Sequence, residues 1–347
     1  ATLMGLRALT PRVNRRAWWL IIIVMVISFF IGFALGGFEL MLKPGVYLEY
    51  ALREAQAGDA GGFGYWQIDT LPGWLFYGKT LLYGIGPVLL ILTALGLARR
   101  LVMVVKERDT TSLLLIAFPV LYLLFMGATQ HYFARYTLPL VPFAAVLAAD
   151  IIAATVMRWR SGREKLATVL AIAIVVIAMA VPFVNSLQLD ALLVQTDTRT
   201  LAKEWIEANI PDGAKLAADW QTHTPPLSTP DQPIPGNSER VYDVQYMGGT
   251  GLFEHTLDWY RQQGYDYLIT SSFIDNIPLV FAQQNAERDA FYASLPQKLT
   301  LIKEFSATGD GSEPPFVFDE IYGPFISVGQ RQRPGPTIKI YQLKARE

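Results

Sequence analysis

The stretch 17–38 reads AWWLIIIVMVISFFIGFALGGF and contains no charged side chain. A helix needs roughly 20 mostly apolar residues to cross a hydrocarbon core of about 30 Å, and this stretch is long enough. Its tryptophan pair stands at one end, where interfacial aromatic residues are enriched. The stretch is too long for a signal peptide, and no small-residue cleavage site follows it. It therefore predicts a membrane-spanning helix.

Four further stretches have the same apolar character, and only Asp150 interrupts them with a charge. The five predicted spans are 17–38, 80–98, 111–128, 136–157 and 166–184. We therefore expect an α-helical membrane bundle of five transmembrane helices over 17–189, with a long exterior loop over 39–79. Such a loop without obvious regular structure is often functional.

The composition agrees with a membrane protein. Only 17% of the 347 residues are charged, whereas about a quarter are charged in a typical soluble domain. The absence of cysteine excludes disulfides and thiolate metal sites. The three histidines stand far apart in the sequence, so we expect no histidine-rich metal centre. No nucleic-acid partner is expected either.

The basic residues predict the orientation, because cytoplasmic loops carry an excess of Lys and Arg. Residues 1–16 and the connections after the second and fourth spans hold 12 of the 16 basic residues found before residue 190. The segment 1–16 is therefore predicted to be cytoplasmic. With five spans, residues 190–347 lie outside, and the chain is a multi-pass protein of the plasma (inner) membrane.

Residues 190–347 read as a small extracytoplasmic α/β domain. This part has a net charge of −8, against +7 for residues 1–189. Apolar periodicity predicts helices and short strands in alternation. The predicted helices are 198–209, 253–263 and 279–294, and the predicted strands are 214–220, 265–271, 299–305 and 337–343.

Arg135 stands at the exterior end of the fourth predicted span, with His131 one helical turn before it and Tyr136 directly after it. An arginine in this position is suited to hold a phosphate with two hydrogen bonds. The alternative is an interfacial arginine whose side chain extends to the lipid headgroups.

Several carboxylates are weaker candidates. Asp150 lies about 21 Å past Tyr136 at the helical rise, towards the cytoplasmic side, so we expect a buried polar partner for it. The acidic residues of the exterior loop could supply a base or a metal ligand, although solvated loop charges are the simpler interpretation. They are Glu49, Glu54, Asp59 and Asp69.

The exterior domain contains no catalytic signature. Gly248–Gly251 lacks the spacing of a phosphate-binding loop and predicts a turn that caps a helix. His223 and His255 are expected on the surface, and Asp319-Glu320 is expected to be an exposed acidic pair.

Several segments together resemble a known family of membrane glycosyltransferases. The run 131–142 (HYFARYTLPLVP) is similar to the RY-x-L-P-x-x-P segment of polytopic GT-C enzymes. These are enzymes of the dolichyl-phosphate-mannose–protein mannosyltransferase and aminoarabinose transferase type. The segments 201–214, 265–272 and 333–341 resemble, in the same order, motifs of the family's exterior C-terminal domain.

The resemblance implies inverting transfer of a sugar from a polyprenyl-phosphate donor to a protein, glycan or lipid acceptor at the exterior membrane face. It places Arg135, His131 and Tyr136 near the lipid phosphate. The loop 39–79 resembles the family's later exterior loop and not its catalytic one. We therefore expect a C-terminal portion without the catalytic aspartate and assign no catalytic residue. A divalent cation assists some of these enzymes, so the cofactor stays open.

Two other functions stay open. The chain could be a non-catalytic membrane accessory protein whose exterior domain binds a partner. It could also be part of a transporter or lipid flippase, but its spans contain one ionisable residue and no pair of broken helices of the kind that forms transport sites.

Overall fold

The computed structural model describes residues 73–128, 133–234, 240–277, 282–314 and 327–343, together with residues 23, 27, 31, 43, 45, 46, 48, 49 and 52. The chain divides into two compact units, residues 1–62 and 63–347. Of the predicted span 17–38, only Ile23, Ile27 and Ile31 are described, and all three are helical and exposed. The rest of that predicted span lies outside the described residues.

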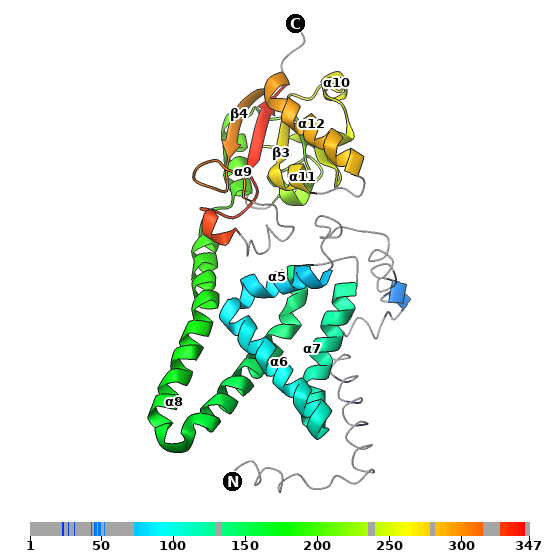
Figure 1. Cartoon of the computed structure of the whole chain (residues 1–347). Helices are drawn as coiled ribbons and strands as arrows, with labels where there is room; N and C mark the ends of the chain where they lie inside the picture. The colour runs from blue at the N-terminus through cyan, green and yellow to red at the C-terminus, as the bar shows by residue number, and fades with distance from the viewer. Residues whose placement is uncertain are drawn as a thin grey trace. The chain divides into compact units, whose positions relative to one another are not determined.

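Long apolar helices fill the first part of the second unit (Figure 1). They are α5 (Gly73–Ile85), α6 (Pro87–Glu107), α7 (Thr110–Ala128), the 3-10 helix η1 (Ala134–Leu140) and α8 (Val141–Leu193). Four of their segments are long and apolar enough to cross a membrane: 73–107, 110–128, 134–158 and 164–209. These segments contain four of the five predicted spans.

Large apolar side chains cover the outside of these helices. Phe125 on α7 is 69% exposed, and Ile172 on α8 is 59% exposed. Soluble proteins seldom expose apolar surface so continuously. Together with the lengths of the helices, this surface indicates a membrane protein.

The predicted loop 39–79 is partly wrong, because regular structure begins inside it. Residues 45, 46, 48, 49 and 52 are helical, and α5 starts at Gly73 within the apolar run GWLFYGK. The helix then breaks at Gly86, which has φ +78° and precedes Pro87. A Cβ at Gly86 would lie 2.9 Å from Val181 Cβ, so only glycine allows this close approach of α8.

The helix α8 contains the last two predicted spans in one run of helical hydrogen bonding. Figure 1 shows it as two arms that meet at a sharp bend. Residues 159–163 separate the two membrane-length segments that this helix contributes to. We call residues 141–158 the first arm and residues 164–193 the second arm.

The helix α6 and the first arm of α8 run in the same direction and pack closely. Thr93 Oγ1 donates to the backbone carbonyl of Ala144 at 3.1 Å. A Cβ at Gly96 would overlap the backbone of Leu147, and the next residue, Ala148, is buried. Small residues allow such close backbone contact between membrane helices.

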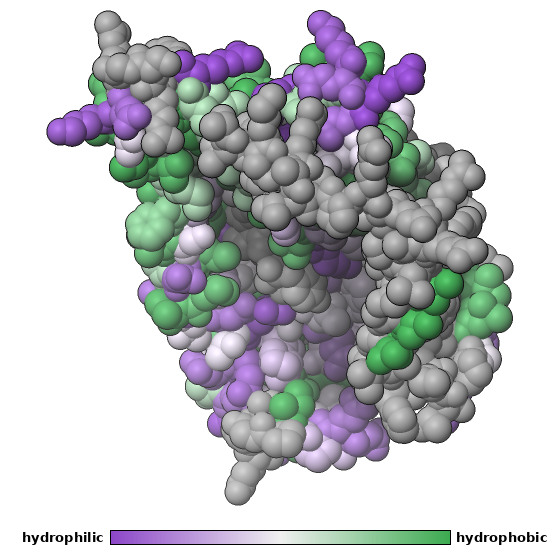
Figure 2. Space-filling view, turned by 90° about the horizontal axis from the view of Figure 1, so that it is seen from below, coloured by the Kyte–Doolittle hydropathy of each residue, from purple (hydrophilic) through white to green (hydrophobic). Residues whose placement is uncertain are grey.

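Both elements run towards one end of the helices, where α6 connects to α7 and α8 bends (Figure 1). We call this the basic end. Seen from below, hydrophilic side chains project at the rim of the molecule and hydrophobic surface lies on its flank (Figure 2). The exposed cations of the basic end are Lys106, Arg108, Arg158 and Lys165.

The sheet domain (residues 198–343) is built around a five-stranded mixed sheet. Its elements are α9 (Thr198–Asn209), β1 (Lys215–Ala218), β2 (Asp243–Tyr246), η3 (Gly251–Glu254), α10 (Leu257–Gln262), β3 (Tyr267–Ser271), α11 (Ser272–Asn276), α12 (Ala282–Lys298), β4 (Thr300–Phe305) and β5 (Ile338–Gln342). The strand order is β2-β1-β3-β5-β4. The strand β1 is parallel to β2 and β3, and β5 is antiparallel to β3 and β4.

The structure confirms the predicted helix 198–209 and all four predicted strands, within a few residues at each end. The strand β2 was not predicted, because its DVQY sequence is short and half polar. The predicted helix 253–263 is shorter than expected. It divides into η3 and α10, since Thr256 caps a new helix by accepting from the Trp259 N–H.

An apolar core covers each face of the sheet. Ile206 of α9 packs with Ile269 and Ile340 on one face. Phe273 of α11 and Leu295 of α12 pack with Leu268 on the other. The alternation of these side chains along β3 fixes the register of the sheet.

Candidate functional site

Arg135 is an exposed residue of η1, the element that opens the third membrane-length segment. Its guanidinium carbon lies 3.9 Å from the centroid of the Phe133 ring and 5.5 Å from that of Tyr136. Such cation–π contacts hold an arginine in place. The exposed guanidinium stands at the end of a membrane-length segment.

Two contacts fix the backbone that carries Arg135. The Tyr136 carbonyl accepts a hydrogen bond from the Tyr122 hydroxyl of α7 at 2.9 Å. Thr137 Oγ1 donates to the Ala134 carbonyl at 2.8 Å. Arg135 and Tyr136 both lie in η1, whereas His131 lies outside the described residues.

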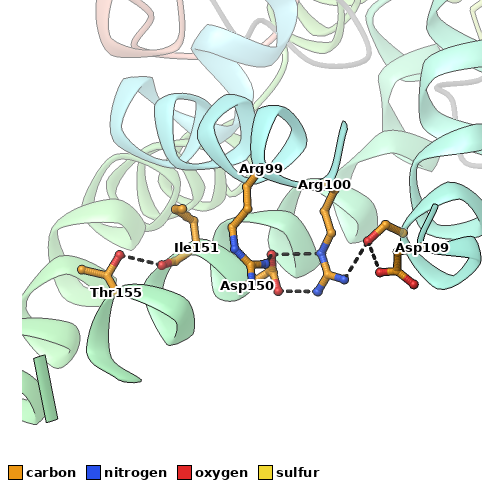
Figure 3. Close-up of polar contacts among 7 residues, drawn as sticks. Arg99, Arg100, Asp109, Asp150, Ile151 and Thr155 are labelled. Carbon is orange, nitrogen blue, oxygen red and sulfur yellow. Dashed lines mark hydrogen bonds and ion pairs between the residues drawn. The ribbon is translucent and has the colours of Figure 1, made fainter. Parts of the chain in front are cut away.

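Asp150 lies on the first arm of α8 and binds two arginines of α6 (Figure 3). Arg99 Nη1 donates to Asp150 Oδ2 at 2.5 Å. Arg100 donates to Oδ2 through Nε at 3.0 Å and to Oδ1 through Nη2. The buried partner predicted for Asp150 is therefore this arginine pair.

Arg99 and Arg100 differ in how fully they are engaged. Arg100 also donates through Nη1 to Ser112 Oγ at 3.1 Å, and Ser112 donates to Asp109 at 2.7 Å. The Arg100 side chain is 19% exposed and that of Arg99 is 32% exposed. Arg100 therefore joins α6, α7 and α8, while Arg99 contacts Asp150 from a more open position.

The charges of Arg99 and Arg100 predicted the orientation of the helices but not the contact with Asp150. Contacts between α6 and α8 recur every three residues on both helices: Thr93 with Ala144, Gly96 with Leu147, and Arg99 with Asp150. This equal spacing on two predicted spans is the signal that could have predicted the contact.

A second buried carboxylate lies in the sheet domain. Asp219 directly follows β1 and is completely buried. Its Oδ1 accepts from the Leu252 N–H at 2.8 Å and from the Tyr292 hydroxyl at 2.6 Å, and its Oδ2 accepts from the Ser271 N–H at 2.8 Å. Burial raises the pKa of Asp219 to about 6, and the hydrogen bond from Tyr292 opposes the rise.

Asp219 occupies the place where ligands bind in many open α/β sheets, outside the carboxyl ends of the neighbouring parallel strands β1 and β3. Here the protein's own groups fill that place. A Cβ at Gly251, which has φ +68°, would overlap Asp219, Tyr292 and Ile274. We therefore interpret Asp219 as a structural clamp. It links the ends of the strands β1 and β3 to η3 and to α12.

The predicted surface position of His223 is wrong. Its ring is buried and stacks on Phe273 at 3.7 Å between centroids. Burial lowers the pKa of His223 to about 4, and the Arg199 charge adds to this. His255 is half-buried and stacks on Trp259 at 3.7 Å. Each histidine stacks on an aromatic ring, Phe273 for His223 and Trp259 for His255, and this stacking favours its burial.

The remaining candidates add no further site. Gly248–Gly251 leads into η3 as a turn, as predicted, with the Gly251 N–H bonded to the Gly248 carbonyl at 3.0 Å. Glu49 is exposed and helical, whereas Glu54, Asp59, Asp69 and the pair 319–320 lie outside the described residues. The parts of the chain that the structure describes contain no group of three or more His, Asp or Glu side chains placed to hold a metal.

A polar pocket of about 520 Å³ lies at the amino-terminal ends of β1 and β3. Asp212, Arg261 and Asp266 contribute its charged groups. It is separate from the clamp at Asp219, which lies at the opposite ends of these strands.

Comparison with protein families, with curated proteins and with solved structures found no match to this chain.

Proposed function

We propose that this chain is the C-terminal part of an integral-membrane glycosyltransferase of the GT-C type. Such an enzyme moves a sugar from a polyprenyl-phosphate donor to an acceptor at the exterior membrane face. The proposal rests on the motif resemblance, and the observation that supports it best is the position of Arg135. This cation is exposed at the end of a membrane-length segment and held over two aromatic rings.

The proposed role of Arg135 is to bind the phosphate of the donor and stabilise the negative charge that develops as the sugar leaves. Tyr136 supports it through the ring contact, and His131 is the third proposed contact. The chemistry also requires a carboxylate that deprotonates the acceptor hydroxyl, and we assign no residue of this chain to that role.

We further propose that five spans cross the plasma membrane, with the amino-terminal segment and the basic end in the cytoplasm. The sheet domain then lies outside and shapes access of the acceptor. The exposed cations of the basic end support this orientation, because cytoplasmic ends of membrane helices are rich in Lys and Arg.

The direct test is binding of a polyprenyl phosphate to the detergent-purified chain, with Arg135→Ala compared with Lys79→Ala. Lys79 is an exposed cation of α5, placed by the orientation argument on the same side of the membrane. We expect Arg135→Ala to weaken binding at least about tenfold, since a charge-assisted contact contributes about 1.5–3 kcal/mol. Lys79→Ala should change it little. Equal effects of the two substitutions, or no binding by the unaltered chain, would overturn the proposal.

The orientation has its own test, because the chain contains no cysteine. Single substitutions Lys106→Cys at the basic end and Glu313→Cys in the sheet domain place one thiol at each exposed site. A membrane-impermeant maleimide should label Glu313→Cys in intact cells and Lys106→Cys only after permeabilisation. The opposite pattern would reverse the proposed topology.

The second candidate function is a non-catalytic accessory protein, and the polar pocket of the sheet domain favours it. Arg261, Asp212 and Asp266 all line this pocket, and such a mixture of charges suits recognition of a polar partner group. If the chain binds no polyprenyl phosphate but captures a partner in a way that Arg261→Ala abolishes, this second function replaces the first.

A further inference from the structure

An apolar groove of about 200 Å³ lies between α6 and the two arms of α8. Each of the three elements contributes to its wall: Leu92 and Leu95 from α6, Ile152 and Val156 from the first arm, and Leu170 and Ile174 from the second arm. The hydroxyl of Thr155 also faces this region, but it donates to its own helix at the Ile151 carbonyl at 2.8 Å. The groove therefore offers a hydrocarbon surface without a free polar group from Thr155.

Arg99 stands beside this groove. It follows Leu95 by one helical turn on α6, and its partner Asp150 directly precedes Ile151 of the groove wall. Figure 3 shows Arg99, Asp150, Ile151 and Thr155 in one row. A cation thus stands next to an apolar groove, and this is the combination that a lipid with a charged head and an apolar chain requires.

The hydrogen bonds of this cluster leave Arg99 with donor capacity. A guanidinium has five N–H donors. Among the described contacts, Arg99 makes one hydrogen bond, to Asp150, whereas Arg100 uses Nε, Nη1 and Nη2. Arg99 is also the more exposed of the two.

The charges at this end favour an anion. Asp150 is shared by two arginines, and Asp109 lies on the Arg100 side of the cluster, behind Ser112. Among the side chains described at the basic end, the cations exceed the carboxylates. The cations are Arg99, Arg100, Lys106, Arg108, Arg158 and Lys165, and the carboxylates are Glu107, Asp109, Asp150 and Glu164.

We infer that an anionic phospholipid of the surrounding bilayer binds at the basic end. One acyl chain lies in the groove between α6 and α8, and the phosphate accepts hydrogen bonds from Arg99. Arginine is suited to this because its planar fork of donors matches a phosphate. The bound acyl chain fills the space between the two arms of α8 and holds them against α6. This site is independent of the proposed function. Arg135 stands at the start of the segment 134–158, and Arg158, a cation of the basic end, stands at its other end. Arg135 therefore lies at the opposite end of the helices from the lipid site.

The test is lipid binding to the detergent-purified chain, measured by native mass spectrometry with phosphatidylglycerol and phosphatidylcholine of identical acyl chains. We expect the unaltered chain to prefer phosphatidylglycerol by about tenfold, because its head carries a net negative charge, whereas the choline cation of phosphatidylcholine offsets the charge of the phosphate. Arg99→Gln should weaken phosphatidylglycerol binding more than phosphatidylcholine binding and so reduce this preference. Arg99→Lys should retain part of it, because the charge remains without the fork of donors.

One variant in the groove tests whether an acyl chain binds there, and one variant of a nearby cation tests whether the lipid preference is specific to Arg99. Ala171→Trp fills the groove from the second arm and should weaken binding of both lipids. Lys106→Gln removes an exposed cation from the same helix and should leave the preference unchanged. The Arg99 variants are expected to stay folded because Arg100 still binds both oxygens of Asp150.

Two results would overturn the inference. If Arg99→Gln and Lys106→Gln lower the preference equally, the lipid responds to the general charge of this end and not to Arg99. If Ala171→Trp binds both lipids as the unaltered chain does, no acyl chain occupies the groove. A thermal unfolding curve of each variant that matches the unaltered chain assigns the changes to binding and not to folding.

Discussion

The helices and the sheet domain each hold a carboxylate away from water, and they do so with different partners. Asp150 receives hydrogen bonds from two guanidinium groups. Asp219 receives them from two backbone N–H groups and a tyrosine hydroxyl. Asp150 is thus balanced by full charges, and Asp219 by dipoles.

The difference follows from the backbone. Within α6 and α8 the peptide groups bond along the helix, so side chains must supply the donors to Asp150. At the ends of β1 and β3 the strands stop, and the N–H groups of Ser271 and Leu252 are available to Asp219. A helical bundle therefore needs arginines where the end of a sheet can use its own backbone.

Asp150→Ala should have the largest effect on stability. It leaves Arg99 and Arg100 without their carboxylate at a partly buried helix contact. Loss of one partner of a fully buried ion pair costs about 3–5 kcal/mol, so we expect a loss of about 3 kcal/mol here. The free energy of unfolding in detergent measures the loss. Asp190→Ala on the second arm of α8 is the control, because Asp190 is exposed and should change stability by less than about 0.5 kcal/mol. Similar values for the two variants would show that Asp150 is not a structural centre.

Arg100→Gln should come next and should separate the two arginines. Arg100 bonds both Asp150 and Ser112, so its loss should cost about 2–3 kcal/mol. Arg99→Gln should cost less than about 1 kcal/mol, as for an exposed pair. Equal costs measured in the same detergent would contradict the unequal roles of the two side chains.

His223→Phe should change how the stability of the sheet domain depends on pH. The folded pKa of about 4 lies below the unfolded value of 6.5. The unfolded chain therefore takes up a proton first as the pH falls, and the unaltered protein loses about 2 kcal/mol between pH 7.5 and pH 5 from this group. His223→Phe removes this loss and keeps the ring that stacks on Phe273.

The measurement for His223→Phe is the difference in unfolding free energy between the two proteins, followed by tryptophan fluorescence of the full chain. Asp219 titrates in both proteins and cancels in this difference. Arg199 is the charged group that also lowers the pKa of His223, and it is unchanged. A difference that is constant from pH 7.5 to pH 5 would rule out a buried neutral histidine.

Tyr292→Phe should have a small effect, a loss of about 1 kcal/mol, because it removes the hydrogen bond to Asp219 and leaves the Leu252 N–H bonded to Asp219. It should also raise the pKa of Asp219 further, since this hydrogen bond lowers it. The folded pKa of Asp219 lies above its unfolded value of 3.8, so stability falls as the pH rises through about 6. The variant should lose more stability over that rise than the unaltered protein, and identical pH profiles would contradict the role of Tyr292.

The local structure of the chain was largely predictable from its sequence. Apolar length predicted the helices that contain spans 80–98, 111–128, 136–157 and 166–184, and periodicity predicted α9 and the strand β3. These features depend on neighbouring residues. The break at Gly86 and the burial of His223 depend on Val181 and Phe273, which are distant in the sequence, so no local pattern predicted them.

The candidate site was predictable only in part. Arg135 and Tyr136 lie together because they are adjacent in one short helix. The contact of Arg99 and Arg100 with Asp150 joins residues about 50 positions apart. The sequence shows the charges of these residues but does not show which of them form pairs. The lipid groove needs the bend of α8, which brings Leu170 towards Ile152, and hydropathy does not report such a bend.

The parallel packing of α6 and the first arm of α8 has a consequence for biosynthesis. Parallel neighbours cannot pair as a hairpin, so α6 must wait in the membrane, with two unneutralised arginines, until α7 and the first arm have been made. At about 5–20 residues per second, the 50 residues between Arg100 and Asp150 take several seconds. During that interval Arg99 and Arg100 lack the Asp150 carboxylate, and the counter-charges at hand are the Glu107 and Asp109 carboxylates at the end of α6 and the anionic lipid headgroups.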